Sequence, residues 1–501
     1  MIDFNIDRRR NFLISGCASY GATIISIVSG LISVPIGLSY FGPVRYGIWL
    51  VIASVMAYLW ISDFGIGLAA LTLIAKTPNP THQRNVLARS VGLLLKLSIL
   101  FFIIIIIINY LFPGWTSILG KIPSNFQGEA KTALLAIIFF VILQIPTTIF
   151  SAVFSGLQKV YWNRVYGALR SVMALAALIV TVLISGNLVA LALFTGLGGL
   201  LVGVISGVHL FLTNPNIRPR LGEKIVSAPS TAFLFKSGIR FLILQIVVLI
   251  IWNTDNLVIS NFLGPEKVIP YAITFKFFQI GLLMVAGLNA ALWPMYGQAT
   301  AKGDWVWIQK TYNNSTILQI IGGGLILIGG VIYSQLIIGL WAGAAAYGGL
   351  AVALAIGGYV YISSFGTSNA SLINGLNPTN SVVVIGIAEG LLNLAISIIL
   401  VKPLGIFGVA LGTLVAGLVT NTWFGPLYIR NKTQRKINLV WRPIFYHAIV
   451  VVLCVVFSIA IVLYFPSGLI RYTTGAFIIC LYLLLSWRVI PKDIKDLFKR
   501  V

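Results

Sequence analysis

Long hydrophobic stretches separated by short polar loops run from one end of the chain to the other. Each stretch has about 20 residues or more, the length that an α-helix needs to cross a hydrocarbon core about 30 Å thick. The alternating segments of about ten residues that are typical of outer-membrane barrels do not occur in the sequence. An all-α polytopic membrane protein is therefore predicted, with fourteen transmembrane spans at residues 11–38, 46–75, 87–112, 131–156, 165–185, 188–212, 238–262, 269–299, 312–340, 347–373, 380–401, 405–429, 444–464 and 472–490.

A Gly-Pro turn separates the first two spans and recurs later in the chain. Gly42-Pro43 is matched by Gly264-Pro265, and the difference in numbering is 264 minus 42, or 222. One match of this kind would carry no weight, because Gly-Pro turns between helices are common. Three landmarks in similar register indicate an internal repeat. The other two landmarks pair Gly156 with Gly375 and Gly186 with Gly405, and both differences in numbering equal 219 (375 minus 156, 405 minus 186).

The repeat predicts two lobes of six spans each. Six is an even number, so both lobes share one orientation, and an axis along the membrane normal should relate them around a central cavity. The longest polar loop, rich in Pro and Arg, separates the two sets of spans. The predicted domains are an N-lobe at 1–212, a cytoplasmic linker at 213–237, a C-lobe at 238–429, and two further spans with a cytoplasmic tail at 430–501.

Composition and charge agree with a membrane protein. The 501 residues are 58% hydrophobic and 9% charged, against about 25% charged residues in a soluble domain. The net charge of +23 is read as topology, because most of the 34 Lys and Arg fall in alternate loops. The positive-inside rule then places both termini in the cytoplasm. A nucleic-acid partner is excluded, since no folded soluble domain is long enough to carry a basic face.

Several classes of activity are excluded by what the sequence lacks. It has no GxxxxGK[ST] loop for nucleotide phosphates. Asp63-Phe64-Gly65 spells a kinase triplet, but no other kinase motif accompanies it. The three histidines and three cysteines show neither metal-ligand spacing nor a disulfide framework. No large loop could hold an active site, so the chain is predicted not to be an enzyme and to need no cofactor.

Acidic residues inside the spans are the strongest functional candidates. A charge within a span costs about 2.5–3.5 kcal/mol on insertion scales unless it faces a cavity or a partner. Asp63, Asp255 and Glu389, together with the basic residue Lys276, are predicted to face the central cavity. Asp255 and Lys276 lie at similar depths on consecutive spans and could pair. A structural role stays open as the alternative for an Asp near a helix break, because its carboxylate can bind the local backbone.

Basic residues inside the spans form a second group. Arg170 and Glu389 are equivalent in the repeat, because 389 minus 170 is again 219, so the two lobes differ in charge at a matching position. A Lys or Arg within two turns of a helix end can extend its head group to the interface instead of facing a cavity. That structural alternative is left open for Lys96, Arg170 and Arg240. Prolines within the spans (Pro35, Pro146 and Pro294) predict bends of the kind tolerated beside a cavity.

The first two spans carry a pattern that resembles a known family. Tyr40-Phe41-Gly42-Pro43, Tyr46-Gly47-Ile48-Trp49 and Ser62-Asp63-Phe64-Gly65-Ile66-Gly67 are similar to the signature of polysaccharide (Wzx-type) flippases. Asp255 upstream of Leu263-Gly264-Pro265, and Gly375-Leu376, are similar too. These flippases belong to the multidrug/oligosaccharidyl-lipid/polysaccharide exporter superfamily. The resemblance covers nearly the whole chain.

The resemblance implies a fold and a substrate. The fold would be two six-helix lobes in a V, similar to MATE drug exporters, with two extra helices. The substrate would be an undecaprenyl-pyrophosphate-linked oligosaccharide, moved across the bacterial inner membrane by alternating access for O-antigen, capsule or exopolysaccharide synthesis. Membrane lipids and the polysaccharide polymerase machinery would be partners. Candidates for binding the anionic head group are Lys276, Arg240, Arg45 and Lys96, and candidates for gating or coupling to H+ or Na+ are Asp63, Asp255, Glu389 and Arg170.

Other functions are weighed against this one. A cation-coupled MATE-type multidrug exporter would need an acidic, aromatic cavity, and the intramembrane Lys96 and Lys276 argue against it. A polysaccharide polymerase or ligase would usually carry a large periplasmic loop, which is missing. A membrane scaffold without transport activity is the least favoured alternative.

Overall fold

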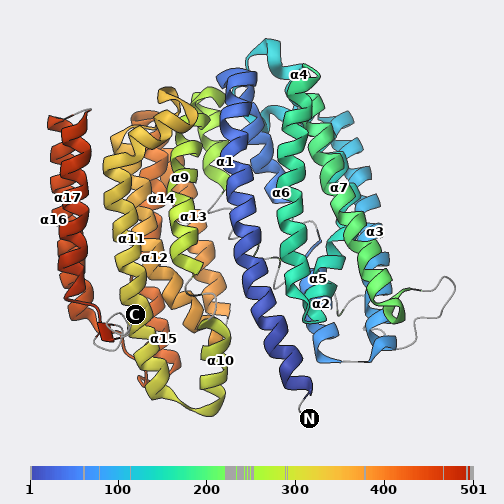
Figure 1. Cartoon of the computed structure of the whole chain (residues 1–501). Helices are drawn as coiled ribbons and strands as arrows, with labels where there is room; N and C mark the ends of the chain where they lie inside the picture. The colour runs from blue at the N-terminus through green and yellow to red at the C-terminus, as the bar shows by residue number, and fades with distance from the viewer. Residues whose placement is uncertain are drawn as a thin grey trace. The chain divides into compact units, whose positions relative to one another are not determined.

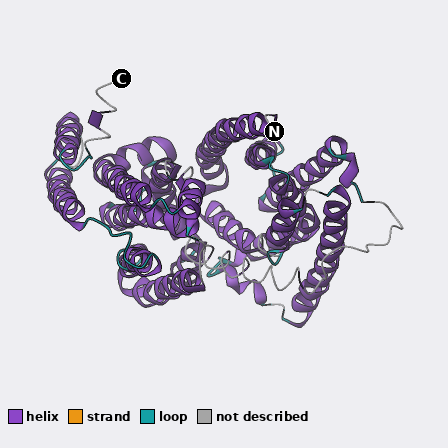
Figure 2. Ribbon diagram, turned by 90° about the horizontal axis from the view of Figure 1, so that it is seen from below, coloured by secondary structure: helices purple, strands orange, loops and turns teal. Residues whose placement is uncertain are grey.

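The computed structural model describes residues 3–59, 63–77, 79–112, 114–219, 253–287, 289, 292–376, 380–465, 468–491 and 495–496, with four isolated positions between 220 and 252. Across these residues the secondary structure is helical, and Figure 2 shows the helices end-on with no strand among them. Twelve helical stretches in the described residues are long and apolar enough to cross a membrane. The predicted all-α polytopic fold is therefore confirmed.

The helices follow the predicted spans closely (Figure 1). They are α1 (Asp3–Leu59), α2 (Ile66–Lys76), α3 (Pro80–Leu111), α4 (Ser124–Gln144), α5 (Thr148–Gly156), α6 (Val160–Leu183), α7 (Leu188–Thr213), α9 (Val268–Gly287), α10 (Leu292–Lys302), α11 (Trp305–Ala342), α12 (Leu350–Gly375), α13 (Asn380–Leu404), α14 (Ile406–Asn421), α15 (Phe424–Lys432), α16 (Trp441–Tyr464) and α17 (Leu469–Trp487). Of the predicted span at 238–262, only the helical residues 253–262 and a few isolated positions are described.

The first two predicted spans lie in α1, on either side of a break at Gly42 (φ 68°, ψ 175°). This backbone conformation suits glycine, which has no Cβ. The second predicted span was wrong as a single helix to residue 75. Phe64 (φ 50°) and Gly65 (φ 70°) turn the backbone, and α2 begins only at Ile66. The apolar pattern hid this turn because the residues around it remain hydrophobic.

Three other predicted spans contain a break. The bend predicted at Pro146 is present as a single turn of 3₁₀-helix, Ile145–Thr147, between α4 and α5. The span predicted at 269–299 is divided into α9, which ends at Gly287, and α10, which begins at Leu292. Pro294 lies in the first turn of α10, where proline is tolerated because the N–H it lacks would be unsatisfied there anyway. The span predicted at 405–429 is divided into α14 and α15.

The chain divides into two compact units. Unit 1 is Met1–Leu249 with Gly264–Glu266, and unit 2 is Ile250–Leu263 with Lys267–Val501. The helices α16 and α17 run side by side in Figure 1, and both pack on α11 within unit 2. The predicted linker at 213–237 lies largely outside the described residues, so the domain limits stay a prediction.

Close helix packing in unit 1 depends on small residues of α7. A methyl group on Gly203 would lie 2.3 Å from Thr147 Oγ1, and one on Gly196 would lie 2.5 Å from the Phe140 side chain. Small residues at such interfaces let helix backbones approach in a membrane, where apolar burial alone does not drive helices together. Either glycine therefore fixes how tightly α7 packs against α4 and the turn that follows it.

The repeat seen in the sequence has a structural counterpart in each unit. In unit 1, Gly156 ends α5 beside the short helix α2, and in unit 2 Gly375 ends α12 beside the short helix α10. The residues that follow adopt nearly the same backbone conformation, with φ −80° and ψ 10° at Leu157 and φ −82° and ψ 6° at Leu376. Equivalent helices thus end in equivalent turns.

Candidate functional site

Asp255 is the centre of a buried polar cluster in unit 2. It is 5% exposed. The hydroxyl groups of Tyr271, on α9, and Thr413, on α14, both donate to Asp255 Oδ2, the latter at 3.0 Å. The other carboxylate oxygen, Oδ1, is buried and has no hydrogen-bond partner among the described residues. A carboxylate is thus held by two hydroxyls, with one oxygen left unsatisfied.

The cluster extends along the interface of α13 and α14. Asn393 Nδ2 donates to Thr413 Oγ1 at 3.4 Å, and Ser397 Oγ donates to Asn393 Oδ1 at 3.0 Å. Asn393 and Ser397 are four residues apart, so they lie on the same face of α13. Ser397 Oγ also lies 3.4 Å from the Val409 carbonyl oxygen. We call Asp255, Tyr271, Asn393, Ser397 and Thr413 the Asp255 cluster.

The chemistry of the Asp255 cluster is that of a small cation site. The atoms that could bind a cation are carboxylate, hydroxyl, amide and carbonyl oxygens, which are hard ligands suited to hard cations. Nowhere in the described part of the chain do three or more His, Cys, Asp or Glu gather as metal ligands. The cluster therefore offers oxygen atoms for a proton or an alkali cation, and offers no thiolate or imidazole for a transition metal.

The possible pairing of Asp255 with Lys276 is wrong. The carboxylate receives its hydrogen bonds from Tyr271 and Thr413. Lys276 follows Tyr271 by five residues on α9, and at 3.6 residues per turn the two side chains leave the helix about 140° apart. Because Tyr271 faces Asp255, Lys276 faces elsewhere; its side chain is half-buried.

Glu389 lies close to the same helix interface. It is 7% exposed, and Asn421 Nδ2, on α14, donates to its Oε1 atom at 3.0 Å. Glu389 precedes Asn393 by four residues, so it lies one turn, or about 6 Å, away along the same face of α13. Both predicted acidic residues of unit 2 are thus buried, and both accept hydrogen bonds from residues of α14.

Asp63 binds local backbone in unit 1. Its carboxylate accepts hydrogen bonds from the backbone N–H groups of Gly65 at 2.9 Å and Gly67 at 3.3 Å. Gly65 is the N-cap residue of α2 and Gly67 lies in its first turn, where N–H groups lack partners within the helix. The carboxylate therefore stabilises the start of α2, which is the structural role that the sequence left open for an Asp near a helix break.

Arg45 forms an ion pair that the sequence did not predict. Its Nε atom lies 3.1 Å from Glu129 Oε2, and its guanidinium group lies 5.1 Å from the centre of the Phe126 ring. Glu129 also accepts a hydrogen bond from the Leu188 N–H at 2.8 Å, at the start of α7. Arg45 remains 42% exposed, whereas Glu129 is 12% exposed. The pair ties α1 to α4 and α7.

The remaining predicted basic residues have separate positions. Lys96 is exposed on α3, on a face that it shares with the exposed apolar residues Leu95 and Ile99. Arg170 is half-buried on α6. Arg240 lies outside the described residues.

Sequence reasoning missed most of the residues that surround Asp255. Tyr271, Asn393, Ser397 and Thr413 are uncharged, and a search for charges within spans passes over them. A signal was present, because Asn393 and Ser397 are polar residues at a spacing of four within an apolar run. The contacts between helices that bring them to Asp255 appear only in the folded chain.

Curated relatives align with most of the chain. A protein of Salmonella typhi described as an O-antigen transporter is 22% identical over 442 residues, covering 84% of this chain and 97% of the relative. A protein of Yersinia pseudotuberculosis described as an O-antigen export protein is 20% identical over 440 residues, covering 85% of this chain and 97% of the relative.

Solved transporter structures share the fold. An inward-facing MATE family multidrug transporter matches with a TM-score of 0.68 and 15% identity, over 84% of this chain and 99% of that one. The lipid II flippase MurJ in an inward closed conformation matches with a TM-score of 0.67 and 15% identity, over 94% of this chain and 98% of that one. The MATE-like fold predicted from the sequence is confirmed.

A family model covers more than half of the chain. The model described as polysaccharide biosynthesis protein matches residues 14–300. The match includes the Gly42 break, the Asp63 turn and Asp255. The resemblance seen in the sequence is thereby confirmed, and the chain belongs to the polysaccharide biosynthesis protein family.

Proposed function

We propose that this protein is a flippase that carries a lipid-linked polysaccharide precursor across the membrane by alternating access. The observation that carries the proposal is family membership combined with a complete transporter fold. Relatives described as O-antigen transport and export proteins align along 97% of their own length. The finer identity that we propose for the substrate is an undecaprenyl-pyrophosphate-linked oligosaccharide, moved from the cytoplasmic to the outer leaflet of the bacterial inner membrane.

The Asp255 cluster supports a further step of the proposal, in which a cation is coupled to transport. A buried carboxylate with an unsatisfied oxygen gains from binding a proton or an alkali cation, since an uncompensated charge is costly inside a membrane. Binding would draw α9, α13 and α14 around one ion. An ion that binds one conformation better than another shifts the population toward it. Such a shift would link an H+ or Na+ gradient to the movement of substrate.

Lys276 is our preferred candidate for the anionic head group. It is half-buried within an apolar helix and faces away from the Asp255 cluster. A pyrophosphate needs cationic groups in a wet environment. Arg240 and Lys96 remain further candidates. Arg45 remains one as well, although Glu129 already neutralises part of its charge. We further propose that both termini lie in the cytoplasm and that the protein contacts the polysaccharide polymerase machinery.

Flipping by purified protein tests the proposal directly. The protein would be reconstituted in liposomes with a fluorescent undecaprenyl-pyrophosphate-linked oligosaccharide, and a membrane-impermeant quencher would report the leaflet that holds it. We expect the protein to equilibrate the lipid between leaflets in response to an imposed H+ or Na+ gradient. Transfer no faster than in protein-free liposomes, with several glycan structures, would refute the proposal.

The likeness to a MATE transporter makes a cation-coupled drug exporter the second candidate. A drug-efflux assay in a strain lacking its own exporters separates the two functions. We expect no increase in resistance to cationic dyes or antibiotics. Efflux that requires Asp255, together with no flipping, would favour the second candidate.

A further inference from the structure

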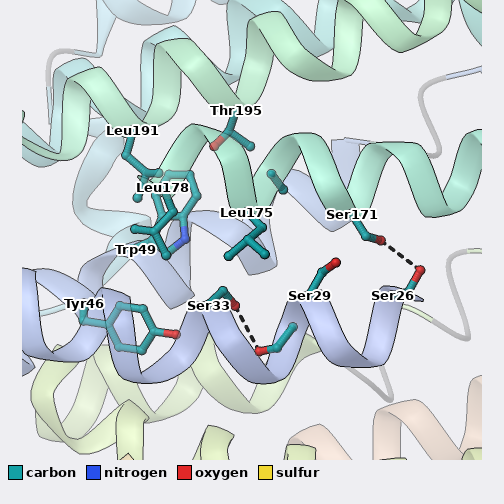
Figure 3. A pocket seen from close by; sticks show the side chains of 12 residues that line it. Ser26, Ser29, Ser33, Tyr46, Trp49, Ser171, Leu175, Leu178, Leu191 and Thr195 are labelled. Atoms are coloured by element: carbon teal, nitrogen blue, oxygen red, sulfur yellow. Dashed lines mark hydrogen bonds between the residues drawn. The ribbon is translucent and has the colours of Figure 1, made fainter. Parts of the chain in front are cut away.

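Unit 1 contains a pocket of about 240 Å³ between α1, α6 and α7 (Figure 3). Figure 3 shows the aromatic residues Tyr46 and Trp49 toward one end, and Ser26, Ser29 and Ser171 toward the other. None of the twelve residues that line the pocket is charged. Ala174 lines it and is exposed, so the pocket is open at that side. We call it the hydroxyl pocket.

The break in α1 builds this pocket. Beyond Gly42 the chain turns back, and the ring of Tyr46 packs against Gly37, where a methyl group would lie 2.5 Å from Tyr46 Cε2. Ser26, Ser29 and Ser33 recur at intervals of three to four residues, which places them on one face of the helix. The aromatic residues and the serines therefore reach the same pocket from two arms of α1.

Not every hydroxyl group of the pocket bonds another described residue. Ser26 and Ser171 bond each other at 2.9 Å, and Ser33 donates to a backbone carbonyl at 3.0 Å. In contrast, Thr195 Oγ1 is buried and has no hydrogen-bond partner among the described residues, and Ser29 and Tyr46, which are 6% and 5% exposed, also line the pocket. Buried polar groups are normally satisfied, by a ligand or water where the protein supplies no partner.

The hydroxyl pocket and the Asp255 cluster occupy equivalent positions of the repeat. The offset of 222 relates Ser33 to Asp255 (255 minus 33) and Trp49 to Tyr271 (271 minus 49). The offset of 219 relates Ala174 to Asn393 (393 minus 174) and Leu178 to Ser397 (397 minus 178). Polar side chains bond one another in unit 2, whereas smaller or apolar residues leave space in unit 1.

We propose that the hydroxyl pocket binds one uncharged pyranose ring of the glycan, an inference that rests on the flippase function proposed above. A pyranose has an apolar C–H face and an edge of hydroxyl groups. Trp49 offers an aromatic surface to that face, and Ser29 and Tyr46 offer hydrogen bonds to that edge. Apolar and aromatic walls with a few placed polar groups are typical of small-molecule sites.

The size and charge of the pocket exclude other parts of the substrate. Its volume lies below the roughly 300–1,000 Å³ of sites for drug-sized ligands, which limits it to about one ring. It has no cationic side chain for a pyrophosphate or a sugar acid, and no carboxylate for an amino sugar or a cationic drug. A neutral monosaccharide unit is the part of a lipid-linked glycan that fits.

Binding of simple sugars to the full chain in lipid nanodiscs tests the inference. The probes are the methyl pyranosides of glucose, galactose and mannose, with methyl glucuronide and glucosamine as charged counterparts, measured by saturation-transfer NMR. We expect at least one neutral pyranoside to bind about tenfold more tightly than its charged counterparts, a difference of about 1.4 kcal/mol. Trp49→Leu should weaken that binding about tenfold, and Ser29→Ala and Tyr46→Phe each several-fold.

Matched variants guard against misfolding and unspecific loss. Trp49→Phe keeps an aromatic face and should bind nearly as well as the wild type. Trp423→Leu, at an exposed tryptophan of unit 2, should leave sugar binding unchanged. Size-exclusion chromatography checks each variant, and Ser29→Ala, which removes a single oxygen atom, carries the test if Trp49→Leu fails to fold.

The outcomes separate this inference from the proposed function. Failure of every neutral pyranoside to bind, or binding that neither Trp49→Leu nor Ser29→Ala weakens, overturns the inference even if flipping is observed. Sugar binding that depends on Trp49 and Ser29 supports it even if the lipid-linked glycan is not flipped, in which case the proposed function fails. Asp255→Asn should lower flipping by roughly 100-fold and leave pyranoside binding intact.

Discussion

At equivalent positions of the repeat, unit 2 buries a carboxylate among hydroxyl and amide groups, whereas unit 1 has serines, a tryptophan and an open pocket. Asp255 is 5% exposed and accepts two hydrogen bonds. Its counterpart Ser33 bonds the carbonyl of Gly30 on its own helix. The same helix scaffold therefore supports a charged, closely packed site in one unit and an uncharged, open one in the other.

This difference suggests a division of labour between the units. A buried carboxylate responds to protonation or to a cation, because its charge is costly in a low-dielectric environment. Neutral hydroxyls beside an aromatic ring have no such response, but they can hydrogen-bond a polar, uncharged ligand. We infer that unit 2 senses the coupling ion and that unit 1 contacts the sugar.

Neutralising Asp255 should produce the largest loss. Asp255→Asn keeps the shape of the side chain but removes the charge that a cation would balance. We expect gradient-driven flipping in liposomes to fall by roughly 100-fold, equivalent to about 2.7 kcal/mol. Glu266→Gln, which removes an exposed carboxylate, is the matched control and should flip normally. Normal gradient dependence in Asp255→Asn would remove Asp255 from the coupling mechanism.

Placing a carboxylate in unit 1 should come second. Ser33→Asp introduces into unit 1 the residue found at the equivalent position of unit 2. In unit 1 the new carboxylate would have Ala174 and Leu178 nearby, where unit 2 has Asn393 and Ser397. An unsupported charge within a span costs about 2.5–3.5 kcal/mol on insertion scales. We expect a lower thermal unfolding temperature, measured in detergent, and a loss of neutral pyranoside binding.

Ser33→Asn is the isosteric control for that variant, because it adds similar bulk without charge. It should be clearly more stable than Ser33→Asp. Equal stability of the two variants would indicate that unit 1 tolerates a charge at this position. The two units would then differ in sequence but not in their ability to hold a buried charge.

The sequence was sufficient for the all-α polytopic fold and for placing Asp255 within an apolar span. Fourteen apolar stretches can be recognised because each must be long enough for a bilayer, and a lone carboxylate inside one of them stands out by its cost. It was not sufficient for Asp63, whose local hydrogen bonds to Gly65 and Gly67 break an otherwise apolar helix. Short-range capping of this kind leaves hydrophobicity unchanged, so an apolar pattern does not reveal it.

The partners of Asp255 could not be predicted for a different reason. Tyr271 is 16 residues away in the chain, but Thr413 is 158 residues away. Which face of α14 meets Asp255 is decided by helix packing, including the contact of Gly412 with Ser397. The hydroxyl pocket has the same origin, because it requires α1 to fold back at Gly42 and to pack on α6 and α7.

Glu389 should have an intermediate effect. Glu389→Gln removes the charge but keeps an oxygen that can accept the hydrogen bond from Asn421, now 3.0 Å long. We expect flipping to fall several-fold, less than in Asp255→Asn, with the unfolding temperature unchanged or raised. A loss as large as that of Asp255→Asn would extend the ion site along α13 to Glu389.

The Arg45–Glu129 pair should have the smallest effect if it is structural. Arg45 is 42% exposed, and partly exposed ion pairs contribute about 0.2–1 kcal/mol to the free energy of unfolding. Arg45→Met and Glu129→Gln should then each lower the unfolding temperature slightly. Each should also lower the flipping rate slightly, and by about the same amount as the other. If Arg45 binds the anionic head group, Arg45→Met alone should lower flipping about tenfold or more, or about 1.4 kcal/mol, while Glu129→Gln should flip at least as fast as the wild type. The second result would place a substrate contact in unit 1 that is charged, and it would confine the uncharged character of that unit to the hydroxyl pocket.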